Sequence, residues 1–352
     1  MNLFDIVTPA NISAYWDDTK ANQSAYMGEM LFPHRKIAGL ELNKIGGRAG
    51  LPVTLKASSF DTQATYRDRL GIEVTKSKMP FFRERMKIDE TTRQQILQIS
   101  QDAILKNYVA RIFDDTNNLI KGARATREKM AIDLISTGHI KIEGNGVKLD
   151  YDYNIGKKQK FKSKWSDPTT STPIQDLIDW VDYFRTEHHV KLGYAVMNTR
   201  TFNLIKASES TRKALYPLVA AGSIGAMLLT AQQVKDLVSS ATGLTILIND
   251  NAYATEVGGA GVPFFPDMKV SLLPVGGTLG NMTFGTTPEE IDLLTNSKTS
   301  SNTQIIDTGV AVYTRLLDHP VNVEVLVSQI CLPSFSTDIE NGSGAIGIVD
   351  LE

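Results

Sequence analysis

A proline-free segment with helical periodicity constrains this chain more than any other feature. No proline occurs from Thr91 to about Ile135, and apolar residues recur there at the spacing of one helix face. As a single helix the segment would be about 65–70 Å long at 1.5 Å per residue, whereas a compact chain of this length is only about 50 Å across. The sequence therefore predicts a spine helix that a simple globule could not enclose. Its apolar positions are Leu105, Tyr108, Ile112, Leu119, Ala123, Met130 and Leu134.

Both ends of the predicted spine carry boundary signals. Asp89 or Thr91 is suited to cap the start of the helix, and Gly138 is suited to end it. Residues 114–118 and Gly122 are poor helix formers, so a kink or a split within the helix stays open.

The segments around the spine have different patterns. Residues 1–40 carry apolar residues too scattered for one amphipathic helix, which predicts an arm laid across another surface. From about 40 to 89, strand-like pieces separated by glycine and proline predict a long, charged, two-stranded excursion. After Gly138 the apolar period becomes two, and Gly144-Asn145-Gly146 predicts the turn of a hairpin.

Residues 165–275 alternate helix-like and strand-like patterns, which predicts a mixed α/β unit. A strand with alternating valines follows at 321–328. Because strand patterns occur both before and after the α/β unit, we expect that unit to be inserted into a discontinuous domain. Its predicted elements are a helix opened by a capping box at Thr172, a strand at Tyr194–Met197, helices at Thr199–Ile205 and Thr230–Ser240, and a strand at Leu244–Ile248.

Charge and cysteine content exclude several classes of protein. Lys and Arg total 37 against 39 Asp and Glu, and a net charge of −2 is not that of a dedicated nucleic-acid binder. The single cysteine excludes an internal disulfide framework and a cysteine-cluster metal site. No run of about 18 apolar residues is present, so the sequence predicts no membrane span.

Motifs for chemistry are mostly missing. The chain has no phosphate-binding loop, nucleophile elbow or zinc-protease motif, and the glycine loop 258–261 lacks a strand–turn–helix setting. Cys331 lies in an apolar run typical of a buried, inert thiol. The sequence thus predicts no catalytic residue, cofactor or metal and favours a structural protein. A cytoplasmic α/β enzyme with its site at Asn249, Asp250 and Asn251, where a predicted strand ends, stays open as an alternative.

Four collinear segments carry a family resemblance. The first runs from Arg67-Asp68-Arg69-Leu70-Gly71 to Met79-Pro80-Phe81-Phe82, and the second from Lys164-Trp165-Ser166-Asp167-Pro168 to Pro173-Ile174-Gln175-Asp176-Leu177. The third runs from Phe264-Phe265-Pro266-Asp267 to Phe284-Gly285-Thr286-Thr287-Pro288-Glu289, and the fourth from Asp318-His319-Pro320-Val321-Asn322 to Leu332-Pro333. Together they resemble the major capsid protein E family of lambda-type tailed phages, over about residues 40–334.

The resemblance implies an α+β fold of the Hong Kong 97-like capsid type. Such a fold has an N-terminal arm, an extended loop, a peripheral domain with a long spine helix, and an inserted axial α/β domain. On this chain the implied divisions are 1–40 for the arm, 41–90 for the extended loop, 91–164 for the spine and hairpin of the peripheral domain, 165–275 for the axial domain, and 276–352 for the return strands and tail.

The resemblance also implies a function and partners. Copies of the chain would form hexamers and pentamers that close into an icosahedral shell around double-stranded DNA. A scaffolding protein, a portal protein and a decoration protein are implied partners, the DNA would be held only by non-specific proximity, and no membrane is involved. The protein would be located in the virion after assembly in the host cytoplasm. A bacterial encapsulin shell, which shares the fold, is an alternative.

The resemblance points to two groups of intersubunit contact residues. Arg67, Arg69, Arg83 and Arg85 of the extended loop would pair with acidic residues of a neighbour, with simple solvation as the alternative. Gly258, Gly259 and Gly261 would lie near the centre of hexamers and pentamers, where five-fold and six-fold packing need different loop conformations.

Overall fold

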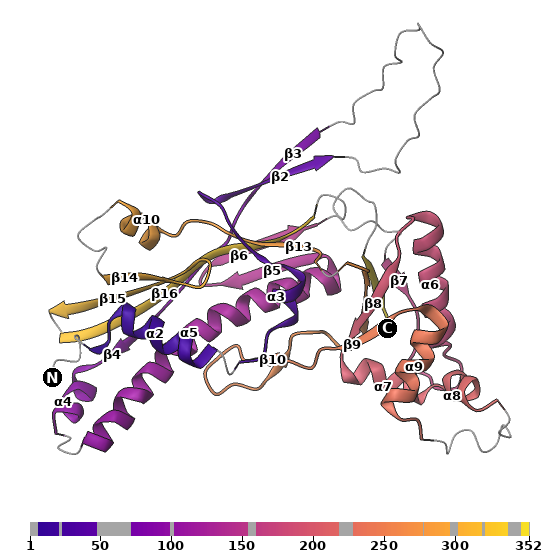
Figure 1. Cartoon of the computed structure of the whole chain (residues 1–352), viewed down its shortest axis with the longest axis horizontal. Coiled ribbons are helices and arrows are strands. Elements are labelled where there is room, and N and C mark those ends of the chain that lie inside the picture. Colours follow the sequence, from indigo (N-terminus) through magenta and orange to yellow (C-terminus); the bar gives the residue numbers. More distant parts are fainter. Residues whose placement is uncertain are drawn as a thin grey trace, which may run out of the picture. The chain divides into compact units, whose positions relative to one another are not determined.

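The computed structural model describes ten stretches of the chain: 6–20, 23–47, 72–98, 102–153, 160–217, 228–276, 278–295, 302–318, 321–336 and 346–351. The chain divides into two compact units (Figure 1), each made of separate segments. Unit 1 contains Met1–Leu42, Lys76–Ala131 and Gly280–Ser334; unit 2 contains Asn43–Thr75, Ile132–Leu279 and Phe335–Glu352.

Unit 1 is built on a six-stranded sheet in the order β1-β13-β16-β15-β14, with β4 also pairing with β16. The short first strand is parallel to β13, whereas β4, β14, β15 and β16 pair in antiparallel fashion. The predicted late strand is confirmed and extends further than expected. The strands are β1 (His34–Lys36), β4 (Phe81–Ile88), β13 (Gly280–Phe284), β14 (Thr303–Ile306), β15 (Val310–Asp318) and β16 (Val321–Phe335).

The predicted spine is confirmed as a helix, α5 (Asp102–Thr137), preceded by the short α4 (Glu90–Gln98). The poor helix formers at 114–118 do not break it. Its end is the predicted one, because Gly138 follows with a left-handed φ of 76°. Asp89 accepts a hydrogen bond of 2.9 Å from the Thr92 N–H at the start of α4. Figure 1 shows the strands of unit 1 running beside α5.

Residues 1–40 do not form one continuous helix, as expected, but the sequence did not predict the short helices within them. Residues Pro9–Lys20 form α2, and Ile12 and Trp16 on one face of it are fully buried. Both pack in a core that also contains Ile112 and Ile120 of α5 and one face of the sheet. Two large apolar residues four apart are enough to anchor a helix this short, although they give only a weak periodic pattern.

The segment after α2 is held by buried polar contacts. The Arg124 guanidinium, on α5, binds both carboxylate oxygens of Glu29 at 2.5 and 2.6 Å, and it donates to the Ser24 carbonyl at 3.0 Å. The Gly28 N–H, in α3 (Met27–Leu31), donates to the Glu128 carboxylate at 2.7 Å. These charge-assisted bonds fix the N-terminal segment to α5 within unit 1.

Unit 2 contains a five-stranded sheet in the order β7-β17-β12-β8-β9. The strands and helices predicted between 173 and 248 are confirmed, with their ends displaced by a few residues. The sequence did not predict β17, which lies inside the sheet. The strands are β7 (Lys160–Lys162), β8 (Leu192–Met197), β9 (Thr245–Ile248), β12 (Lys269–Pro274) and β17 (Gly347–Asp350); the helices are α6 (Pro173–Glu187), α7 (Thr199–Ala207), α8 (Glu209–Leu215) and α9 (Ala231–Thr242).

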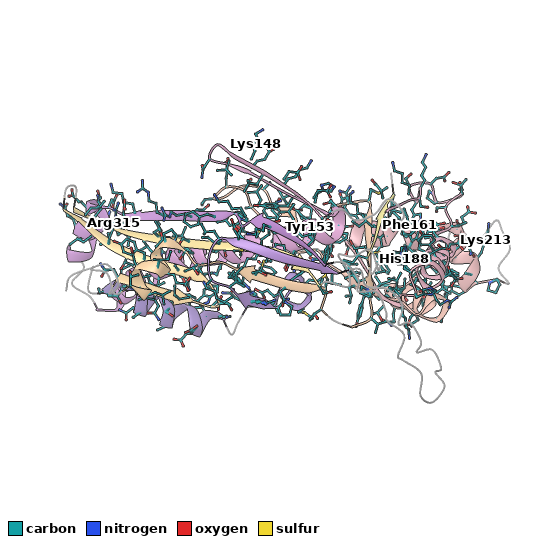
Figure 2. All side chains as sticks on the ribbon, turned by 90° about the horizontal axis from the view of Figure 1, so that it is seen from above. Lys148, Tyr153, Phe161, His188, Lys213 and Arg315 are labelled. Carbon is teal, nitrogen blue, oxygen red and sulfur yellow. The ribbon has the colours of Figure 1, made fainter. Side chains whose placement is uncertain are left out.

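The capping box expected at Thr172 is wrong, because the Thr172 side chain caps no N–H of α6. Asp176, in the first turn of that helix, instead accepts from the Trp165 indole N–H at 2.7 Å. Trp165 is buried and stacks on Trp180 at 5.9 Å between ring centroids. Phe161, labelled in Figure 2, joins the same aromatic cluster from β7.

Three two-stranded sheets complete the described chain. The predicted Gly-Asn-Gly turn is confirmed between β5 and β6, with positive φ at Asn145 and Gly146. Lys148 lies near the tip of this hairpin in Figure 2. Within the described residues no helix is long and apolar enough to cross a bilayer. Two of them are antiparallel hairpins, β5 (His139–Gly144) with β6 (Val147–Asp152) and β10 (Ala252–Tyr253) with β11 (Val262–Pro263), and the third pairs β2 (Glu41–Gly47) with β3 (Ile72–Lys78). A further helix, α10, is Pro288–Leu294.

Candidate assembly surfaces

One face of the unit 1 sheet carries a set of basic side chains. Side chains alternate between the two faces of a strand, and Met86 and Ile88 of β4 pack in the core beneath α5. Arg83, Arg85 and Lys87 therefore lie on the opposite face. Across the sheet they form three rows, which are Arg83–Ser328–Ala311, Arg85–Leu326–Tyr313 and Lys87–Glu324–Arg315. We call Arg83, Arg85, Lys87 and Arg315 the basic sheet face.

Arg83 is tied into its own subunit. Its guanidinium binds the Glu289 carboxylate of α10 at 2.5 Å and lies over the Phe81 ring, 4.8 Å from the centroid. The other Glu289 oxygen accepts from the Ser328 hydroxyl at 2.7 Å. The row nearest α10 therefore has a carboxylate of its own.

The two remaining rows share a single carboxylate. Glu324 accepts from the Arg315 guanidinium at 2.9 Å, and Arg85 lies 3.7 Å from its second oxygen. Lys87 of β4 is exposed and is the residue directly opposite Glu324 on the neighbouring β16. The Arg85 side chain is 65% exposed, against 11% for Glu324. Three cations around one buried carboxylate leave an outward-facing positive excess.

The sequence pointed to only half of this surface. It identified Arg83 and Arg85, which the fold brings together on β4, whereas Arg67 and Arg69 lie outside the described residues. It missed Lys87 and Arg315. The alternation of charged and apolar residues along 81–88 was a signal for Lys87, but Arg315 joins the group only through the pairing of β15 with β16.

The glycine loop lies between β10 and β11 and is exposed. Gly258 adopts a left-handed φ of 75°, and the Gly259 N–H donates to the Glu256 carbonyl at 3.0 Å. The neighbouring Val257 is fully exposed. The tip is thus a glycine turn with an uncovered apolar residue, and Gly261 returns the chain to β11.

Groups suited to chemistry are used structurally. Burial raises the pKa of the Cys331 thiol to about 12 despite the opposing effect of Arg127, which leaves it unreactive. The Asp250 carboxylate accepts from the Thr199 N–H at 2.8 Å and from its hydroxyl, at the start of α7. Asn249 is buried, and its side chain accepts from the Asn251 N–H at 3.2 Å. Across the described stretches, no cluster of three or more His, Cys, Asp or Glu residues could hold a metal ion.

One family profile and several solved structures match this chain. The profile of the family described as "Phage major capsid protein E" matches residues 8–336. No sequence among the curated proteins matches. A candidate capsid protein of a prophage from Escherichia coli CFT073 has a similar structure, with a TM-score of 0.61, 16% identity, and coverage of 98% of this chain and 99% of that one.

Two further solved structures extend the comparison. A phage-related protein from Bordetella bronchiseptica RB50 gives a TM-score of 0.54 at 13% identity and covers 98% of this chain and 97% of that one. An encapsulin from Synechococcus elongatus PCC 7942 gives a TM-score of 0.41 at 12% identity, with coverage of 95% and 94%.

Proposed function

Because the chain belongs to the phage major capsid protein E family, and is therefore a shell-forming capsid protein of the virion, we propose that its copies assemble as hexamers and pentamers. These capsomers close into an icosahedral shell around a double-stranded DNA genome. The fold is the α+β capsid fold of the Hong Kong 97-like type. The observation that carries the proposal is the family match over residues 8–336, which spans both compact units.

The proposed parts of the subunit follow the capsid fold. The arm, extended loop, peripheral domain and axial domain correspond to the divisions 1–40, 41–90, 91–164 with 276–352, and 165–275. The exposed turn at Gly258, Gly259 and Gly261 is proposed to lie near the centre of each capsomer, where its glycines allow different conformations in rings of five and six.

The proposed partners follow from shell assembly. The main partner is the chain itself. A scaffolding protein would guide the procapsid, a portal protein would nucleate it, and a decoration protein could bind the finished shell. Assembly would take place in the host cytoplasm. The net charge of −2 is consistent with a shell that holds DNA by confinement rather than by tight phosphate binding.

Two earlier alternatives have less support. An encapsulin shell would share the fold, but the family match is to a phage capsid protein. An α/β enzyme would use Asn249, Asp250 and Asn251, but the side-chain oxygens of Asn249 and Asp250 accept hydrogen bonds from backbone and hydroxyl groups of the same chain.

Sedimentation of the purified full-length chain tests the proposal. Analytical ultracentrifugation with negative-stain microscopy of the fast-sedimenting material should find closed shells, or rings of five and six. A 38.7 kDa species that never assembles, even with a crowding agent or a co-expressed scaffold, would contradict it.

A further inference from the structure

Unit 1 carries opposite charge on the two sides of its sheet. The basic sheet face has four cations, Arg83, Arg85, Lys87 and Arg315, and two carboxylates, Glu289 and Glu324. Four minus two leaves two positive charges in excess. The excess belongs to Arg85 and Lys87, because Arg83 binds Glu289 and Arg315 binds Glu324 at hydrogen-bond distance.

The other side of the sheet is covered by α2 and α5, and their outward surface is acidic. Asp17 and Asp18 of α2 and Asp114 and Asp115 of α5 are exposed. Within the described part of the chain none of the four is ion-paired, and Asp114 only accepts a hydrogen bond of 2.8 Å from the Tyr15 hydroxyl. We call these four residues the acidic helix face. The exposed cations described on α2 and on α5 up to residue 122 are Lys20, Arg111 and Lys121. Lys20 is ion-paired with Asp307, so four carboxylates without an ion pair compare with two such cations.

We propose that the basic sheet face of one copy docks against the acidic helix face of a second copy. The two surfaces lie on opposite sides of one compact unit, so the contact is head-to-tail. A head-to-tail contact joins two different patches, and it generates a ring when the rotation between copies closes. A symmetric two-fold contact would instead bring like charges together, which is unfavourable by several kcal/mol when they are juxtaposed.

The chemistry of the proposed contact is specific. Arg85 and Lys87 present donors to carboxylates on a second copy, and Leu326 and Tyr313 beside them are half-buried and supply apolar area. Arg85 pairs only loosely at 3.7 Å within its own subunit, so it can bind a partner carboxylate without first breaking a short hydrogen bond. Arg83 instead binds Glu289 within its own subunit and so connects β4 to α10.

The inference rests on the proposed function, and a charge swap tests it. The variant Arg85→Glu with Lys87→Glu should raise the protein concentration needed for capsomer assembly by at least about tenfold, as should Asp17→Lys with Asp18→Lys. Combining all four substitutions in one chain makes both faces complementary again and should restore assembly. The readout is sedimentation velocity across a concentration series.

Controls separate folding from docking. Each variant should keep the wild-type circular dichroism spectrum and melting behaviour; if Arg85→Glu with Lys87→Glu does not fold, Arg85→Gln with Lys87→Gln replaces it and should weaken assembly less. Lys148→Glu, on the β5–β6 hairpin, is the matched charge reversal and should leave this contact unchanged.

The outcomes distinguish the two proposals. If the wild-type chain never assembles, the proposed function fails. If the wild type assembles and the sheet-face variants assemble at the same concentration, the docking inference alone is wrong. The inference would also be wrong if the double variants assemble poorly and the fourfold variant does not restore assembly. The acidic helix face would then not be the surface that binds the basic sheet face.

Discussion

At the scale of single residues, Arg124 accounts for much of the order in the N-terminal segment. Its guanidinium is nearly buried and is satisfied by Glu29, Gln23 and the Ser24 carbonyl. Burial alone would raise the pKa of Glu29, but the Arg124 hydrogen bond and charge, with the Tyr26 N–H, outweigh it and leave that pKa lowered. The pair therefore stabilises the fold only while Glu29 is ionised.

Glu29→Gln should reveal this pH dependence. Removing the charge leaves Arg124 buried without its counter-ion and should cost about 2–3 kcal/mol at pH 7. Because the folded pKa of Glu29 is lowered, the contribution is complete above the unfolded value near 4.5 and is lost as pH falls through the folded value. The difference from wild type, measured by denaturant unfolding, should shrink at low pH.

The exposed Glu187 provides the control for that experiment. Glu187→Gln at the end of α6 should leave unfolding unchanged at either pH. Equal stability of Glu29→Gln and the wild type at pH 7 would show that the buried pair contributes nothing.

At the scale of elements, α2 is a helix whose sequence signal was present but too weak to predict it. Thr8 and Pro9 are a helix-start signal, and the Thr8 hydroxyl accepts from the Asn11 N–H at 3.2 Å. Ile12 and Trp16 supply the i, i+4 spacing. The signal was present but weak, because only three residues of α2 are buried, Pro9, Ile12 and Trp16. The spine had many more turns over which the same period could accumulate, so it was predictable.

Close approach of α3 to α5 depends on a residue without a side chain. A Cβ added at Gly28 would lie 2.7 Å from the Ala131 Cβ and closer still to the Glu128 carboxylate. Gly28→Ala should therefore push the segment off α5 and destabilise unit 1 by about 1–3 kcal/mol. Hydrogen exchange should rise in residues 23–36.

The matched substitution is Gly144→Ala, where a Cβ would meet nothing within 4 Å. It should leave hydrogen exchange in residues 23–36 at the wild-type rate. Unchanged exchange in Gly28→Ala would mean that α3 can shift without loss of its contacts.

At the scale of the whole molecule, periodicity and the four collinear segments were enough to predict the fold class. They were not enough to predict which residues form the charged surfaces. The spine, the Gly-Asn-Gly hairpin and the α/β alternation are local patterns, so they could be predicted. The pairing of Arg315 with Glu324 and the contact of Tyr15 with Asp114 join segments that are distant in the sequence. A surface made from several strands and helices has no contiguous sequence signal.

The exposed turn of the β10–β11 hairpin gives a test at this scale. Val257→Asp should leave the folded subunit intact, because Val257 is fully exposed. If the turn lies at the capsomer centre, five or six added charges would meet there and assembly should be lost. Negative-stain microscopy measures this, with Val147→Asp at the β5–β6 tip as the control.

If Val257→Asp forms normal shells, the turn does not lie in a contact between subunits. Loss of assembly in both variants would instead mean that added charge at any hairpin tip is harmful, and would remove the support for a central position.

The position of β17 affects the order in which the subunit can be made. This strand lies between β7 and β12, yet it is synthesised after every other strand of its sheet. While translation continues, β7 has no partner and β12 has an open edge. The five-stranded sheet of a nascent chain therefore stays incomplete until residues 347–350 have left the ribosome, and we expect productive subunit contacts to wait until then.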